Sequence, residues 1–366
     1  MQIQRAAVAA ALLLVLVHVL DIDLDAQLTA PRTPRVELRP APAMRLPGNV
    51  DSNSPAIWQR TNGWNLLFVM TSSDGRPSTT FGFHSGAMGR PRPIVLEPWP
   101  GGGIWMEAVI ADVDRIWYGY YHNENVAEAC GTTDKVVPRI GAARSRDYGR
   151  TWEPLGLVLE ASPRSYECAS TNDYLVGGIG DFSVMLDADS KYLYFLLSTY
   201  PRTSWLQGVS VARLAWADRD APEGKIEVWR DRIWGIASGV PLDNGALQWI
   251  YPVPVPIFRA RRSWHTEPVD AFWGPSVHWN THLEQYVMLL SRARDGRFLQ
   301  EGIYVSFAPT LDDPRLWSTP VKILDGGEWY PQIIGTQPGV GTDKLAGEWA
   351  RFFMAGTSNY TIRFIK

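Results

Sequence analysis

Acidic side chains recur where short, aromatic-rich strands are expected to begin. Asp51, Glu107 and Asp181 each precede or fall within the start of such a segment, and Asp270 stands just before another. Two carboxyl groups facing one ligand can hydrolyse a glycosidic bond, because one activates water or attacks the sugar and the other protonates the leaving oxygen. A third acid nearby can raise the pKa of its neighbour by like-charge repulsion. We therefore predict Asp51, Asp181 and Glu107 as catalytic residues.

Each of these carboxylates also has a structural interpretation. Asp51 and Asp181 could cap turns at strand starts, and Glu107, on an otherwise apolar strand, could form a buried salt bridge. Other polar or aromatic residues fall in segments expected to reach the same ligand. The predicted substrate contacts are His122, Glu124, Asp270, Trp273, Arg292, Glu301 and Tyr330.

The segments that must position these side chains repeat a theme of four short strands joined by tight turns. Five such units are predicted, over residues 54–97, 105–160, 182–230, 276–324 and 331–365. Units of four strands at this spacing are typical of a β-propeller. We predict an all-β fold, a single propeller domain over 48–366 with five blades of four antiparallel strands. A sixth blade hidden in the insertion 231–273, as in a six-bladed sialidase-like propeller, and a two-sheet sandwich are the alternatives.

Propeller topology decides which polar residues matter. In this architecture the innermost strand of each blade starts at the ligand-facing mouth, and the loop between the second and third strands opens there too. Asp51, Glu107, Asp181 and Asp270 belong to the first kind of position. The second kind includes Glu124. Acidic groups are therefore expected around one mouth.

Ser145-Arg-Asp-Tyr-Gly-Arg-Thr-Trp152 matches the pattern Ser-x-Asp-x-Gly-x-Thr-Trp. This segment resembles the Asp-box of sialidases and related propellers. The resemblance implies a structural hairpin on the face away from the ligand, in which the aspartate accepts backbone hydrogen bonds and the glycine adopts a backbone angle that other residues resist. The residues of the motif are Ser145, Asp147, Gly149, Thr151 and Trp152.

A second resemblance covers residues 50–366. Val50-Asp51-Ser-Asn-Ser-Pro-Ala-Ile-Trp58, Gly180-Asp181-Phe-Ser-Val-Met-Leu-Asp187 and Trp273-Gly-Pro-Ser-Val277 are similar to the first, third and fourth blades of five-bladed glycoside hydrolases of the arabinanase, xylosidase and β-fructosidase type. The resemblance implies catalysis by Asp51 and Asp181. Arabinanase-like members carry Glu where Trp273 stands here, so the resemblance does not supply the general acid.

The N-terminus predicts export. Arg5 followed by the apolar run 6–20 is typical of a signal peptide, expected over 1–26, with an uncleaved anchor as the alternative. Residues 27–47, rich in Pro and Arg, are expected to form an extended linker. Cys130 and Cys168 are the two cysteines, and an exported chain favours a disulfide between them over two free thiols. The expected location is periplasmic or secreted.

Composition limits the function classes. The formal charge is −3, which argues against nucleic-acid binding, and 17 Trp, 14 Tyr and 12 Phe suit a protein that stacks aromatic rings on sugars. We predict a monomer without a stable membrane span after signal cleavage, acting on an oligo- or polysaccharide as a glycoside hydrolase. A non-catalytic glycan- or protein-binding propeller is one alternative. A sialidase-like exo-hydrolase, which would need converging arginines such as Arg144, Arg213 and Arg292, is another. No cofactor is expected, while a structural or central-channel metal ion such as calcium stays open.

Overall fold

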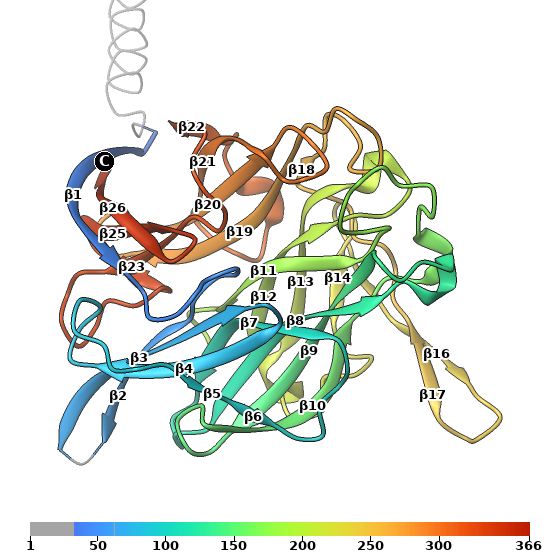
Figure 1. Ribbon diagram of the computed structural model, residues 1–366, viewed down its shortest axis with the longest axis horizontal. Coiled ribbons are helices and arrows are strands. Elements are labelled where there is room, and N and C mark those ends of the chain that lie inside the picture. The colour runs from blue at the N-terminus through green and yellow to red at the C-terminus, as the bar shows by residue number, and fades with distance from the viewer. Residues whose placement is uncertain (1–32, 62) are drawn as a thin grey trace, which may run out of the picture. The chain divides into compact units, whose positions relative to one another are not determined.

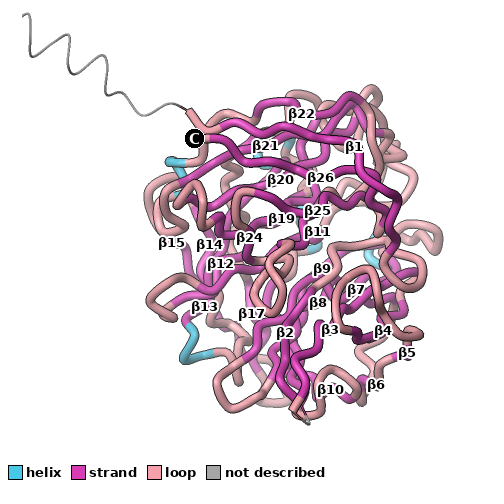
Figure 2. The backbone as a smooth tube through the Cα atoms, turned by 90° about the vertical axis from the view of Figure 1, so that its left-hand side faces the viewer, coloured by secondary structure: helices cyan, strands magenta, loops and turns pink. Residues whose placement is uncertain are grey.

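Antiparallel sheets follow one another along the chain, as the alternation of strands and turns predicts. The computed structural model describes residues 33–61 and 63–366, and Val36–Ile365 form one unit. Within that unit five sheets lie around a common centre (Figure 1), and strands and loops make up nearly all of the part of the chain that the structure describes (Figure 2). The prediction of a five-bladed propeller is confirmed, and the described residues form neither a sixth blade nor a two-sheet sandwich.

The strands pair in chain order from the centre outwards. The first sheet contains β2 (Ala56–Thr61), β3 (Trp64–Ser73), β4 (Arg76–Gly82) and β5 (Arg92–Pro93). The second contains β7 (Gly103–Ala111), β8 (Trp117–Val126), β9 (Val136–Ser145) and β10 (Thr151–Leu159), with β6 (Val95–Leu96) at its edge. The third contains β11 (Ile179–Leu186), β12 (Tyr192–Thr199), β13 (Gly208–Ala215), β14 (Glu227–Trp229) and β15 (Trp234–Ile236).

The fourth sheet follows the same order, and the fifth does so apart from its outermost strand, β1. The fourth contains β19 (Ala271–Asn280), β20 (Gln285–Ala293), β21 (Gln300–Ala308) and β22 (Val321–Asp325), and β24 (Leu345–Ala346) pairs in parallel with β19. The fifth contains β23 (Gln332–Gly335), β25 (Trp349–Met354), β26 (Thr357–Ile365) and β1 (Arg35–Arg45). The insertion carries β18 (Phe258–Arg259), which pairs with β13, and the hairpin of β16 (Ser238–Pro241) and β17 (Leu247–Ile250), which projects at the lower right of Figure 1.

Strand β1 corrects the expectation of a linker over residues 27–47. Residues 35–45 pair with β26 and complete the fifth sheet, so the first described segment joins the end of the chain. Arg351 Nη2 donates to Pro42 O at 2.7 Å and fixes the segment further. The prolines of this segment are compatible with a strand because β1 lies at the outer edge of its sheet, where a missing N–H costs no ladder bond.

The predicted signal peptide, residues 1–26, lies outside the described residues. Among the residues that are described, no helix is long and apolar enough to cross a membrane.

Apolar side chains fill the space between neighbouring sheets. Separate buried clusters lie between the first and second sheets around Trp117, between the second and third around Phe195, and between the third and fourth around Met288. Further clusters around Phe352 and Phe353 close the ring between the fourth, fifth and first sheets. Each sheet is therefore stabilised by apolar side chains buried on both of its faces. The strand starts at the centre are not needed for this packing and can carry polar groups.

The turn between β9 and β10 contains the Ser145–Trp152 motif. Asp147 Oδ1 accepts from the backbone N–H of Thr151 at 2.9 Å and of Arg150 at 3.1 Å, and its Oδ2 accepts from Thr151 Oγ1 at 2.8 Å. Gly149 has a φ of +79°, and its carbonyl accepts from Trp152 Nε1 at 3.0 Å. These bonds hold the turn in one conformation and seat the Trp152 ring, which is buried.

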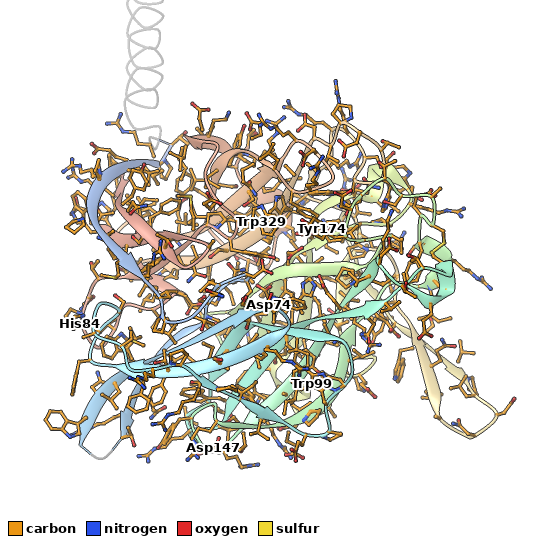
Figure 3. The ribbon with its side chains drawn as sticks, in the orientation of Figure 1. Asp74, His84, Trp99, Asp147, Tyr174 and Trp329 are labelled. Atoms are coloured by element: carbon orange, nitrogen blue, oxygen red, sulfur yellow. A yellow bond between two sulfur atoms is a disulfide. The ribbon has the colours of Figure 1, made fainter. Side chains whose placement is uncertain are left out.

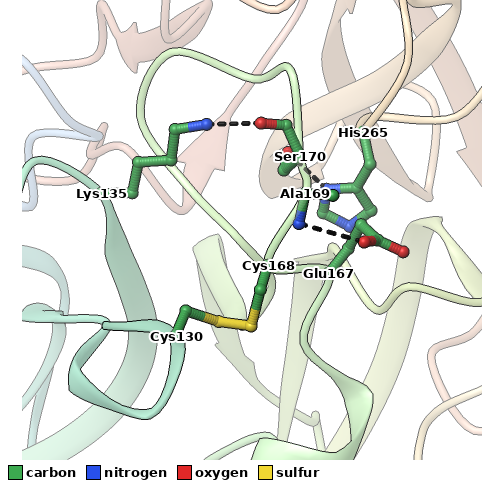
Figure 4. The surroundings of a disulfide bond; sticks show 7 residues. All are labelled: Cys130, Lys135, Glu167, Cys168, Ala169, Ser170 and His265. Atoms are coloured by element: carbon green, nitrogen blue, oxygen red, sulfur yellow. Dashed lines mark hydrogen bonds between the residues drawn. A yellow bond between two sulfur atoms is a disulfide. The ribbon is translucent and has the colours of Figure 1, made fainter. Parts of the chain in front are cut away.

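Cys130 and Cys168 form the predicted disulfide, with their Cα atoms 5.2 Å apart (Figure 4). It joins the loop after β8 to the loop between β10 and β11. Next to it, Lys135 donates to the carbonyl of Ser170, and Ser170 Oγ lies 2.8 Å from His265 Nδ1. The loop between β10 and β11 is therefore fixed at both its cysteine and its serine.

Replacing Asp147 with alanine should lower the free energy of unfolding by about 1–3 kcal/mol, because the N–H groups of Arg150 and Thr151 lose their acceptor. Thermal unfolding of Asp147→Ala measures this loss. Asp189→Ala, in an exposed turn of the third sheet, is the control and should unfold close to wild type. Equal melting temperatures for Asp147→Ala and wild type would contradict the structural role.

Removing the disulfide in a Cys130→Ser/Cys168→Ser variant should cost about 3–4 kcal/mol of stability, because the 38-residue loop is no longer closed in the unfolded chain. Urea unfolding with and without reductant measures the effect. Reductant should destabilise wild type and leave the double variant unchanged. Free thiols in non-reducing peptide maps of the wild-type protein would show that the bond is not formed.

Candidate active site

Three acids from three sheets open onto one pocket at the centre. Asp51 precedes β2, Glu107 lies on β7 and Asp181 lies on β11, and all three line a cavity of about 130 Å³. His122, Glu124, Trp273 and Tyr330, predicted as substrate contacts, line it as well. The pocket lining also includes Trp105, Pro138, Tyr174, Leu175, Phe298 and Trp329. The inner strand starts thus come together as propeller topology requires.

Asp181 is held by two phenol groups. Tyr200 donates its hydroxyl to Oδ2 at 2.5 Å, and Tyr330 donates to Oδ1 at 3.0 Å. An ionised carboxylate accepts on both oxygens in this way. Asp181 and Tyr330 have φ values of +42° and +52°, a region that costs energy for residues with a Cβ, so the fold holds both in strained conformations at the site.

His122 connects Asp181 to Glu124. The backbone N–H of Asp181 donates to Nδ1 at 3.0 Å, and Nε2 lies 3.2 Å from Glu124 Oε1. The imidazole also packs on the backbone of Gly180, where a Cβ atom would lie only 2.6 Å from Cε1. A side chain at position 180 would therefore displace the His122 ring from its contact with Asp181.

Burial and repulsion give the carboxyl groups different affinities for a proton. Burial raises the pKa of Asp51 to about 6, helped by the charges of Asp181 and Glu124. The pKa of Glu107 is raised further above its ordinary value, first by complete burial and then by the charge of Asp181. The backbone N–H of Asn53, 3.2 Å from Glu107 Oε2, opposes this rise without cancelling it. The site therefore contains two acids of raised pKa, of which Glu107 is shifted well above its ordinary value and Asp51 to about 6.

His122 is subject to opposing influences. Burial lowers its pKa, while Glu124, Asp181 and Glu107 raise it, with a net rise to about 9. The N–H bond from Asp181 acts against that rise, because a protonated Nδ1 cannot accept it. The neutral ring with its proton on Nε2 satisfies both observed contacts, so we assign this form to the site.

Aromatic rings form one wall of the pocket. Trp273 packs edge-on against Phe298, Trp329 and Tyr330 at centroid distances of 4.7 to 6.0 Å. The Nε1 atoms of Trp105 and Trp273 are buried without a hydrogen-bond partner among the described residues. Buried donors of this kind are costly unless a ligand or water accepts from them. Trp329 and Tyr174 lie near each other in Figure 3 and pack edge-to-face at 6.5 Å.

Several lining residues were not among the predicted site residues. Tyr174 and Leu175 come from the loop that the disulfide anchors, and Phe298 comes from the loop between β20 and β21. Tyr200, which follows β12, supports the site from behind the lining by donating to Asp181. Tyr200 stands at a second-to-third-strand loop, the position that propeller topology singles out, but its hydroxyl contact depends on where Asp181 lies. Aromatic residues in otherwise polar loops were the available signal for Tyr174 and Phe298, and Leu175 carried no such signal.

Three predicted substrate contacts do not line the pocket. Arg292 donates two hydrogen bonds to Asp270, at 2.7 and 2.9 Å, and a third to Tyr304. Tyr304 in turn donates to Glu301, which also pairs with Lys322. The reason is the alternation of side chains along a strand: Arg292 pairs across from Phe272, whereas Trp273, one residue further, faces the pocket. Asp270, Arg292 and Glu301 thus form an ion-pair network on the other face of the fourth sheet.

The sialidase-like alternative required arginines that converge on one carboxylate. Arg144 pairs with Glu153 and Asp220, Arg213 pairs with Glu227, and Arg292 pairs with Asp270. These arginines lie on β9, β13 and β20, in three different sheets. These three arginines therefore do not form the cluster that a sialidase-like site would need.

A metal ion was left open by the sequence. Glu107, His122 and Asp181 each offer a ligand atom within 4.8 Å of the others. However, both nitrogens of His122 already make hydrogen bonds, and both oxygens of Asp181 accept from tyrosines. Calcium prefers six to eight oxygen ligands, so this set does not suit it, and we derive no step through a metal.

Comparisons with known proteins agree with this architecture. No family model and no curated protein matches the chain. Among solved structures, an endo-arabinase from Bacteroides thetaiotaomicron matches at 9% identity and a TM-score of 0.50, covering 88% of this chain and 97% of its own. A thermostable family-43 glycoside hydrolase matches at 12% identity and a TM-score of 0.47, covering 87% and 91%. The catalytic domain of a GH62 α-L-arabinofuranosidase from Coprinopsis cinerea matches at 10% identity and 0.46, covering 91% and 97%. The chain therefore has a five-bladed β-propeller fold similar to that of the endo-arabinase.

Proposed function

We propose that the protein is a glycoside hydrolase whose active site is the central pocket. The observation that carries this proposal is that carboxyl groups from three different sheets, Asp51, Glu107 and Asp181, line one aromatic pocket. Similarity to an endo-arabinase and other glycoside hydrolases supports the same reading. The substrate is accordingly an oligo- or polysaccharide, bound with its rings against the wall around Trp273.

The roles follow from the proton affinities. Glu107, whose pKa is raised the most, is the proton donor to the leaving oxygen. Asp51, with a pKa of about 6, is ionised at neutral pH and acts as the base or nucleophile. Asp181, fixed by Tyr200 and Tyr330, lies beside both, and its charge raises their pKa values. A donor on the second sheet takes the place of the acid that arabinanase-like proteins have at position 273.

A non-catalytic glycan-binding propeller is the second candidate. It is favoured by Trp273, because this side chain is 1% exposed and packs as part of the aromatic cluster where the related hydrolases have their acid. The two candidates differ in one measurable property, turnover.

We further infer that the protein works outside the cytoplasm. The signal-peptide pattern at residues 1–26 and the Cys130–Cys168 bond support this location, because disulfides persist in oxidising compartments.

Wild-type protein should release reducing sugar ends from at least one member of a panel of arabinan, xylan, galactan and polygalacturonate. Asp51→Asn and Glu107→Gln should each lower turnover by about 100-fold or more, since an amide keeps the shape but neither takes nor gives the proton. Asp181→Asn should lower turnover to a similar extent, because it removes the charge that tunes the other two acids. Asp187→Asn, at the opposite end of β11, is the matched control and should retain wild-type turnover. Binding of a glycan by the wild-type protein without any turnover would favour the second candidate.

The pH profile should report the charge of Asp181. The rising limb of kcat/KM for wild type should have its midpoint near pH 6, where Asp51 ionises. Removing the negative charge in Asp181→Asn lowers the pKa of Asp51 and Glu107, so both limbs should move to lower pH in the residual activity. A profile that keeps its midpoints in this variant would show that Asp181 does not tune the pair.

A further inference from the structure

A second cavity lies between the first and second sheets, at the strand ends opposite the pocket. It has a volume of about 370 Å³, in the range of small-ligand sites. Its lining comes from β3, β4, the segment around β5 and the turn between β9 and β10. We call this cavity the lateral groove. Along β3, Trp64 in the groove and Ser72 beside the active site are eight residues apart, about 26 Å at the rise of a strand. Figure 3 likewise shows Asp147, which lines the groove, far from Trp329 and Tyr174.

Aromatic rings form the base of the lateral groove. Phe68 is buried and packs against Phe81 at 5.3 Å and Tyr148 at 5.8 Å. Trp64 stands at one end, 63% exposed, with its edge against Phe83. Exposed rings on a supported base offer flat apolar surface of the kind on which the C–H face of a sugar stacks.

Arginines surround these rings. Arg90, Arg92 and Arg150 line the groove, are exposed, and make no ion pair among the described residues. The acid in the lining is Asp147, whose oxygens accept from Ser145, Arg150 N–H and Thr151. The lining therefore carries an excess of positive charge in a protein whose formal charge is −3. Guanidinium groups that are not already paired are suited to bind carboxylates with two hydrogen bonds.

A buried hydroxyl adds an independent observation. Thr79 lines the groove, is 6% exposed, and its Oγ1 has no hydrogen-bond partner among the described residues. Its neighbour Thr80, in contrast, donates to Gly89 O at 3.1 Å. Leaving such a hydroxyl unpaired costs energy that a ligand's polar group could recover.

We propose that the lateral groove binds a segment of an acidic glycan, with uronate carboxylates on the arginines and sugar rings on Trp64 and Phe81. If the protein is the proposed glycoside hydrolase, its substrate is then a uronate-bearing polysaccharide that is also held at a point remote from the pocket. This statement about the substrate rests on the proposed function. Binding itself does not, because it needs only the residues of the groove. Neutral glycans lack the carboxylates that these arginines complement, and nucleic acid is disfavoured by the overall negative charge.

Hexagalacturonate is the probe, with its methyl ester as the uncharged counterpart, titrated calorimetrically at low salt. The titrations use Asp51→Asn protein so that turnover does not consume the ligand. Arg92→Gln/Arg150→Gln should weaken hexagalacturonate binding by about tenfold or more and affect the ester little. Trp64→Ala should weaken binding of both ligands, and its melting temperature should stay at the parent value because the side chain is largely exposed.

Arg115→Gln/Arg232→Gln is the matched control. These arginines are exposed in turns of other regions, and the variant removes the same charge. An equal loss in both double variants would show non-specific attraction and overturn the proposal. So would unchanged affinity in the groove variants, or binding of an oligothymidylate through the same arginines without binding of hexagalacturonate. Failure of hydrolysis in wild type, with groove binding intact, would overturn the proposed function alone.

Discussion

The fold depends on one segment at its centre, Asn53 and Ser54 ahead of β2. Asn53 donates from Nδ2 to Phe182 O at 2.9 Å and Pro275 O at 3.2 Å, and from its backbone to Glu107. Ser54 exchanges two hydrogen bonds with Gln332, at 2.6 and 3.1 Å. The first sheet is thereby tied directly to each of the other four. Since these groups are buried, losing a partner would leave unsatisfied polar atoms at the axis.

The hydrogen bonds of Asn53 and Ser54 also determine where the acids of the central pocket lie. Because the inner strands start at the same level around Asn53, acids near their starts must face one another in a small space. Placing several carboxyl groups there is unfavourable for stability, and the raised pKa values of Asp51 and Glu107 express that cost. Tyr200 and Tyr330 offset part of it by donating to Asp181. The disulfide and His265 hold the loop that covers the pocket edge with Tyr174.

The strands and their grouping could be predicted because strand and turn patterns are local. The position of Asp51, Glu107 and Asp181 at one mouth also followed, since topology places strand starts together. Strand β1 could not be anticipated, because its partner β26 is some three hundred residues away and its prolines resemble those of a linker. Asp270 and Arg292 were assigned to the mouth because the sequence does not reveal which face of the fourth sheet turns inwards. The lateral groove arises only when two sheets pack side by side.

Complete burial and the neighbouring charge of Asp181 raise the pKa of Glu107 well above its ordinary value, and the proposed proton donor depends on this rise. Carbon-13 NMR of the glutamate side-chain carboxyl groups, with Glu107→Gln to assign the signal, measures this directly. We expect the Glu107 signal to titrate well above the ordinary range of a glutamate. An ionised Glu107 at pH 5 would contradict it.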